Sequence, residues 1–191
     1  MKLAGIRPGF AFGQALTRAV RLTAIAGLPL VGVVLGGRIY DALWALRHSP
    51  QAVQSMLASV QQLGTAGLLS LGFYSLVLIA VAEELAFRGY FHHRLRSALP
   101  GRLSLGRLRL TRGAVASGAL FAAVHLTNWL WQPAPPLWLC LVIHAGQFVF
   151  GVVAAYLYDE TGSLLPPILL HGVINVIDHF GVAALVLWLG R

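Results

Sequence analysis

The sequence predicts an all-α fold, a polytopic membrane helical bundle of five to six transmembrane helices with an additional N-terminal interfacial helix. Two observations support this prediction. The 191-residue chain is 58% hydrophobic and only 10% charged, whereas roughly a quarter of the residues in soluble domains are charged. Its apolar residues also gather into segments of about the 20 residues that an α-helix needs to cross a bilayer.

Five apolar segments are long enough to cross a membrane, and together they form a membrane-embedded domain over residues 22–191. The last of them contains Pro166 and Pro167 near its start and Gly181 further on, so it is either one helix or two. Ahead of this domain, residues 1–21 lack the apolar region and cleavage site of a signal peptide, and residues 9–21 have the pattern of an amphipathic helix in the interface. The five segments are residues 22–44, 65–91, 113–132, 136–158 and 163–189.

The basic residues predict the orientation of the chain. They concentrate before the first span and between the second and third, two regions that lie on the same side of the membrane. The positive-inside rule then places the N-terminus and the 92–112 loop in the cytoplasm. Because arginine far outnumbers lysine, as in GC-rich bacterial genomes, we expect a bacterial inner membrane. The 92–112 arginines suit anionic lipid, and the net charge of +8 does not indicate a nucleic-acid partner.

Several ionisable side chains lie inside the predicted spans, where such groups are costly and are usually functional or paired. Glu84 and Arg88 are four residues apart on one helix face, so we expect an ion pair. Glu83 is rotated by about 100° from Glu84 and faces elsewhere, as a usable general base. Arg38 and Asp41, three residues apart near a helix end, pair with each other or extend to the interface.

Two further polar pairs lie on other spans. His125 follows Phe121 by four residues, and Asn175 follows His171 by four, so each pair shares a helix face. Polar groups on three spans favour a bundle around one polar cavity, because facing lipid would be worse for each of them. We therefore expect Glu83, His125, His171 and Asn175 to converge within about one water-bridged contact. Such a set supplies what hydrolysis needs, a base that activates water and donors that hold an oxyanion.

The stretches "EELAFRG", "FAAVH" and "HGVIN" resemble, in order and context, the EExxxR, FxxxH and HxxxN motifs of the CAAX-protease and bacteriocin-processing family of intramembrane glutamic endopeptidases. The resemblance covers about residues 73–178 and includes the linking stretch "GVVAAYLYDETGSLLPPILLHGVIN". It implies hydrolysis of a peptide bond of a membrane-associated protein or peptide, with no metal or other cofactor.

The resemblance also implies roles for the motif residues. Glu83 with His125 would activate a water, His171 and Asn175 would steady the oxyanion, and Glu84 with Arg88 would hold the second helix in place.

Several residues near the motifs are not assigned a role by the family. Asp178 lies seven residues after His171 on roughly the same face, where it would orient that histidine. His144 matches no motif, and we expect it to pack or to hydrogen-bond between helices. His92 and His93 fall at the end of the second span and are expected to be interfacial.

Two alternatives remain at this level. One glutamate and two histidines are also a zinc-ligand set, which would make the protein a zinc-dependent intramembrane metalloprotease, although the HExxH helix motif is absent. The other is a non-catalytic membrane protein, such as a bacteriocin-immunity factor or a scaffold. A secondary transporter is disfavoured because the sequence shows no inverted repeat.

Overall fold

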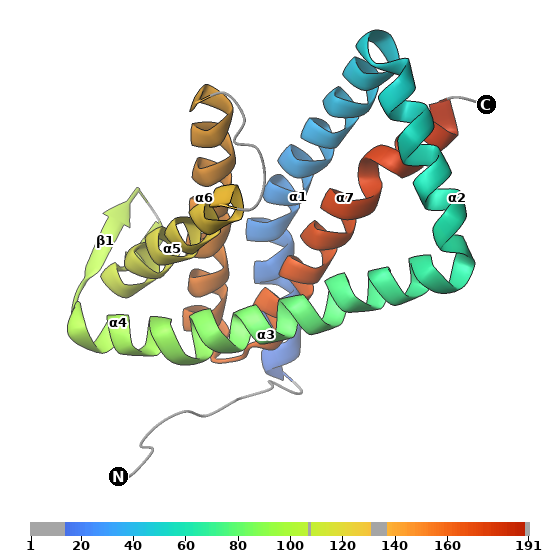
Figure 1. Cartoon of the computed structure of the whole chain (residues 1–191). Helices are drawn as coiled ribbons and strands as arrows, with labels where there is room; N and C mark the ends of the chain where they lie inside the picture. Colours follow the sequence, from blue (N-terminus) through green and yellow to red (C-terminus); the bar gives the residue numbers. More distant parts are fainter. Residues whose placement is uncertain (1–13, 107, 131–136, 190–191) are drawn as a thin grey trace. The chain divides into compact units, whose positions relative to one another are not determined.

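The computed structural model describes residues 14–106, 108–130 and 137–189. Nearly all of this part is helical, and a single two-stranded antiparallel hairpin interrupts the helices within it (Figure 1). Two segments, η1 and η2, are wound as π-helices and η3 is a 3₁₀-helix. The elements in chain order are α1 (Gln14–His48), α2 (Pro50–Phe73), η1 (Tyr74–Ile79), α3 (Ala80–Glu84), η2 (Leu85–His92), α4 (His93–Ala98), β1 (Arg102–Leu105), β2 (Leu108–Thr111), α5 (Arg112–His125), η3 (Leu126–Leu130), α6 (Leu137–Thr161) and α7 (Leu165–Leu189).

The predicted all-α membrane fold is confirmed. In the described ranges, four helical stretches are long and apolar enough to cross a membrane: Val20–His48, Val53–Ala98, Arg112–Leu130 and Leu137–Thr161. The last apolar segment forms one continuous helix, α7. Pro166 and Pro167 fall in its first turn, where a missing backbone N–H leaves no intrahelical hydrogen bond unmade.

The helix α2 begins earlier than the sequence suggested. Residues 45–64 were expected to connect two spans, but the chain is helical again from Pro50 onward. Proline is well tolerated at the first helical position, and the residues after it include several good helix formers. The predicted start of the second span, at residue 65, coincides with a kink at Gly64, whose φ of +60° and ψ of −179° are not helical. The N-terminal residues Gln14–Arg21 are the first turns of α1, and residues 9–13 lie outside the described part.

The chain divides into two compact units. The first contains the described residues up to Ala26 together with Glu83–Pro167, and the second contains Gly27–Ala82 and the described residues from Ile168 onward. In the first unit, α5 packs against α6, and the buried side chains include Phe121, Phe150 and Leu157. In the second, a cluster around Ala42 and Val53 includes Leu46, Met56, Leu57 and Leu185.

Two glycines allow α5 and α6 to pack with their backbones close together. A Cβ atom placed on Gly151 would lie 2.7 Å from Cα of Gly118, and a Cβ atom on Gly118 would lie 2.9 Å from the backbone oxygen of Phe148. Real Cβ atoms do not approach other atoms this closely, so only glycine fits at either position. Small residues at such crossings are typical of membrane helices, because they maximise van der Waals contact where lipid offers no hydrophobic driving force.

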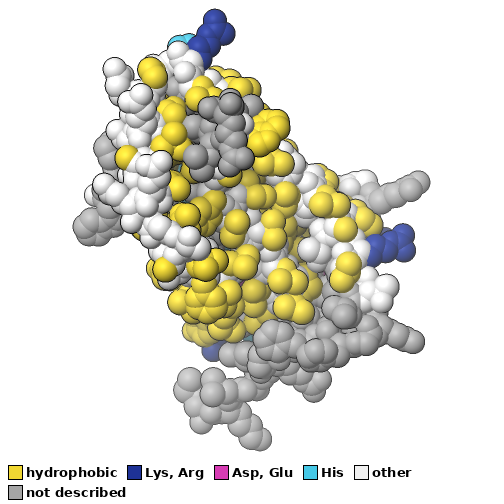
Figure 2. Space-filling model, turned by 90° about the vertical axis from the view of Figure 1, so that its right-hand side faces the viewer, with side chains coloured by type: hydrophobic (Ala, Val, Ile, Leu, Met, Phe, Trp, Pro, Cys, Tyr) yellow, Lys and Arg dark blue, Asp and Glu magenta, His cyan; other side chains and the backbone are white. Residues whose placement is uncertain are grey.

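The surface of the described part is largely apolar. Figure 2 shows hydrophobic side chains covering most of one face, with basic side chains at its margins. Large apolar residues are well exposed on several helices, including Val33 (74%), Leu69 (69%) and Leu141 (63%). An exposed apolar area of this kind is expected for helices that contact lipid rather than water.

The contact between Gly118 and Gly151 leads to a first prediction. Gly151→Ala should lower the free energy of unfolding by roughly 1–3 kcal/mol, the usual cost of overpacking. Gly146→Ala is the matched control on the same helix, because a Cβ atom there meets nothing within 4 Å. Thermal unfolding of the purified proteins in detergent should separate the two variants, and equal stability would contradict the tight contact.

Candidate active site

The predicted ion pair between Glu84 and Arg88 is present and fully buried. Nη1 of Arg88 donates to Oε1 of Glu84 at 2.7 Å, and both side chains are 0% exposed. Nη2 of the same guanidinium donates to the backbone oxygen of Gly151 in α6, at 3.1 Å. The ion pair therefore ties the helical segment that carries both glutamates to α6.

Aromatic rings surround the buried guanidinium. Its central carbon lies 4.9 Å from the ring centroid of Phe121, 5.3 Å from that of Phe150 and 5.9 Å from that of Phe87. A desolvated cation gains attraction from aromatic faces at these distances, which offsets part of the cost of removing it from water. Phe121, the phenylalanine of the FxxxH motif, therefore has a structural function of its own, which is to stabilise the buried guanidinium.

Glu83 points toward a different helix from Glu84. Its Oε2 lies 3.9 Å from Nε2 of His125 in α5, and the two side chains are 31% and 20% exposed. This distance is too long for a direct hydrogen bond, yet short enough for one small molecule to contact both atoms. Neighbouring glutamates therefore have different environments, one sealed against an arginine and one partly open beside a histidine.

The orientation of His125 is fixed by its own helix. Its Nδ1 lies 2.7 Å from the backbone oxygen of Phe121, and a carbonyl can only accept, so Nδ1 carries a hydrogen. In the neutral ring Nε2 is then an acceptor, and this is the nitrogen that faces Glu83. The ring also contacts that of Phe121, with centroids 4.3 Å apart.

His171 and Asn175 lie on α7, in the second unit. Nδ2 of Asn175 donates to the backbone oxygen of Ser75 in η1 at 3.2 Å, and His171 is buried, with 5% exposure. Glu83 and His125 belong to the first unit, so the convergence of all four residues stays a prediction.

The contacts of Asp178 and His144 refine what the sequence suggested. Asp178 is half exposed and forms an ion pair with Arg38 at 3.4 Å, so the contact described for it is with α1, and its predicted support of His171 stays a prediction. The side chain of Asp41, the other partner considered for Arg38, lies outside the described residues. His144 donates through Nδ1 to the backbone oxygen of Cys140, at 2.7 Å, within its own helix.

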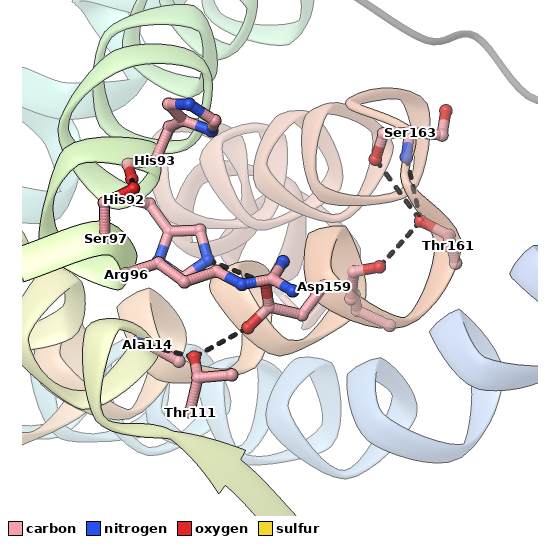
Figure 3. A network of polar contacts seen from close by, with 10 residues as sticks. His92, His93, Arg96, Ser97, Thr111, Ala114, Asp159, Thr161 and Ser163 are labelled. Atoms are coloured by element: carbon pink, nitrogen blue, oxygen red, sulfur yellow. Dashed lines mark hydrogen bonds and ion pairs between the residues drawn. The ribbon is translucent and has the colours of Figure 1, made fainter. Parts of the chain in front are cut away.

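Sequence reasoning missed a polar network centred on Asp159, near the end of α6 (Figure 3). The carboxylate is 5% exposed and accepts hydrogen bonds from Nε2 of His92 at 3.0 Å and Nη1 of Arg96 at 2.8 Å. It also accepts from the Thr111 hydroxyl at 2.7 Å, and the same hydroxyl accepts from the backbone N–H of Ala114 at the start of α5. His92, expected at the interface, is therefore fully buried.

The Asp159 network and the Arg88 cage lie along the same stretch of the chain. His92 follows Arg88 by four residues and Arg96 follows by eight, so their side chains lie near one side of the helical run from η2 into α4. Two signals in the sequence pointed to the Asp159 network. They are the four-residue spacing of these basic side chains and the acidic residue at the end of the apolar run of α6.

Taken together, these features define a class, a polytopic helical membrane protein in which a partly exposed glutamate faces a histidine from another helix beside a buried ion pair. The model of one protein family, described as type II CAAX prenyl endopeptidase Rce1-like, matches residues 65–177. This range is more than half of the chain and contains all three motifs, so the chain belongs to that family and is a CAAX-type membrane protease. Neither the curated proteins nor the solved structures that were compared with it gave a match.

The burial of Arg88 leads to a second prediction. Arg88→Leu should reduce the free energy of unfolding by roughly 3–5 kcal/mol, because it leaves the Glu84 carboxylate buried without its partner. The double variant Glu84→Gln/Arg88→Leu should recover part of this loss, since the remaining side chain is neutral. Thermal unfolding in detergent is the measurement.

The matched control is Arg94→Leu, on the same helical run, because Arg94 is exposed and its described contact is with the ring of Tyr90. If Arg88→Leu is as stable as Arg94→Leu, the ion pair does not stabilise the fold as its burial indicates.

Proposed function

We propose that the chain is an intramembrane endopeptidase in which Glu83 activates the water that cleaves a peptide bond. The observation that carries the proposal is the placement of Oε2 of Glu83 3.9 Å from Nε2 of His125. Membership of the CAAX protease family supports peptide-bond cleavage, and the geometry supports the choice of Glu83 as the base.

The two glutamates differ in the way that this assignment requires. The Glu84 carboxylate is fully buried and holds the Arg88 guanidinium, so it is shielded from water, and a proton on it would remove the charge that balances the arginine. Glu83 is 31% exposed and lies beside an acceptor nitrogen. A water between them would donate one hydrogen to the carboxylate and one to Nε2 of His125, leaving its lone pairs directed at a substrate carbonyl.

The reaction follows from this arrangement. The water oxygen attacks the carbonyl carbon of the scissile bond while Glu83 takes one proton, and a tetrahedral oxyanion forms. The carbon–nitrogen bond then breaks as that proton passes to the leaving amine, which leaves a carboxylic acid and restores the glutamate. Donors aimed at the oxyanion supply much of the rate enhancement in such reactions.

We assign the oxyanion donors to His171 and Asn175. One hydrogen of the Asn175 amide is directed at Ser75, and the second remains available for a substrate oxygen. The burial of His171 would strengthen a hydrogen bond to a developing negative charge, because the local dielectric constant is low.

The setting of the reaction is also part of the proposal. We infer a bacterial inner membrane from the excess of arginine over lysine. We place the N-terminus and the 92–112 segment in the cytoplasm because the basic residues concentrate there. The substrate is a membrane-associated protein or peptide, and the reaction needs no metal or other cofactor.

The assignment of Glu83 leads to a third prediction. Glu83→Gln keeps the size and polarity of the side chain but removes its ability to accept a proton, so cleavage should fall by about 10²-fold or more. The substrates would be a peptide library that includes farnesylated peptides ending in a CAAX sequence. Glu160→Gln, at the end of α6, makes the same chemical change outside the site and should keep full activity.

His125→Ala should lose activity to a similar extent, and the double variant should be little worse than either single one, because residues that act as a unit are not additive. If the loss of activity in the double variant equals the product of the two single losses, the two side chains act separately. Full activity of Glu83→Gln would exclude it as the base.

A fourth prediction separates this mechanism from the zinc alternative. Asn175→Ala should reduce cleavage by roughly 10²–10³-fold if its amide holds the oxyanion, whereas a zinc enzyme would not need that amide. Activity after treatment with a chelator, together with metal analysis, completes the test. If Asn175→Ala cleaves normally while chelation abolishes cleavage, the glutamate mechanism is wrong.

A further inference from the structure

The hairpin of β1 and β2 has two chemically different faces. Its register pairs Arg102 with Thr111, Leu103 with Leu110, Ser104 with Arg109 and Leu105 with Leu108. Directly opposed residues share a face and successive residues alternate. All four leucines therefore lie on one face, and both arginines lie on the other with the serine and the threonine.

The leucine face is largely uncovered. Leu110 is buried at 5% exposure and anchors one end, while Leu103, Leu108 and Leu105 are 41%, 40% and 65% exposed. The hairpin joins two stretches that are long and apolar enough to cross a membrane, ending at Ala98 and starting at Arg112. This order along the chain puts the hairpin at the membrane boundary, where exposed leucines are suited to contact acyl chains.

A cavity of about 270 Å³ lies beside the polar face. It is lined by Arg96, Gly101, Arg102 and Thr111. The backbone N–H of Arg112 donates to the oxygen of Gly101 at 3.1 Å. The Arg112 side chain also runs past Gly101, with its Nε 3.7 Å from where a Cβ atom would be. Guanidinium groups from three segments of the chain thus surround or adjoin the cavity.

The buried Asp159 carboxylate holds two walls of this cavity in place. One of its oxygens accepts from Arg96 and the other from Thr111 (Figure 3). Arg96 uses Nη1 for this bond, and about half of its side chain remains exposed (52%). Among the described contacts of the cavity, three arginines are matched by the carboxylate of Asp159. Planar guanidinium groups bind phosphate oxygens in pairs.

We propose that this cavity binds the phosphate of an anionic phospholipid, with the lipid's acyl chains passing the edge of the hairpin toward its leucine face. Charge complementarity selects the headgroup, and the hairpin's position at the membrane boundary places a phosphate layer beside the arginines. A soluble phosphate shares the headgroup chemistry but has no chains that could reach the leucine face. This site is separate from Glu83 and His125, and the proposal does not depend on the protease mechanism.

The test is titration of the purified full-length protein, in neutral detergent, with dihexanoyl phosphatidylglycerol. We expect saturable binding that Arg102→Gln weakens by about tenfold or more, the scale of one charge-assisted hydrogen bond. Arg109→Gln removes the same charge from the same face of the hairpin but outside the cavity, and it should change the affinity little. If both variants weaken phosphatidylglycerol binding equally, the lipid is attracted by the general positive charge rather than by the cavity, and the proposal is wrong.

Two further measurements distinguish an anionic lipid from other ligands. Dihexanoyl phosphatidylcholine, which carries no net charge, should bind at least about tenfold more weakly, because the arginine charge is not matched. Leu105→Ser should weaken phosphatidylglycerol but not inorganic phosphate. If inorganic phosphate binds as tightly as phosphatidylglycerol, or if Leu105→Ser leaves lipid binding unchanged, the ligand is a soluble anion and the lipid assignment is wrong. Thermal unfolding of each variant verifies that it is folded.

Discussion

A buried positive charge is the constraint on which the site depends. Arg88 is fully buried, so its charge is balanced by the protein itself, through Glu84, the oxygen of Gly151 and aromatic rings. These partners come from the glutamate-bearing helical run, from α5 and from α6, so satisfying one cation fixes three segments at once. With Glu84 committed to this pair, the adjacent Glu83 is left to face His125.

Phe121 connects this constraint to the chemistry. Its ring packs against the guanidinium of Arg88, and its backbone oxygen accepts a hydrogen bond from Nδ1 of His125. The same residue therefore stabilises the buried cation and determines which histidine nitrogen faces the carboxylate. The spacing of four residues in the FxxxH motif has a direct physical reason, since a helix brings the histidine ring back over the residue one turn earlier.

The sequence predicted much of the fold and of the candidate site, and each feature that it did not predict was missed for a physical reason. The spacing of four residues placed Glu84 and Arg88 on one helix face, and the apolar segment around them indicated that the two charges would pair. The Asp159 network was missed because its members are far apart in sequence and each has a common explanation at the membrane boundary. Residues 50–63 were not predicted as helix because their glutamines make them too polar for a span, although nothing in them prevents a helix.

The close packing of Gly118 against Gly151 has a mechanical consequence. Gly151 meets Gly118 of α5 through its backbone and accepts the hydrogen bond from Arg88 of η2 through its oxygen, so one residue of α6 contacts both segments. Movement of either segment away from α6 would therefore cost a contact at Gly151.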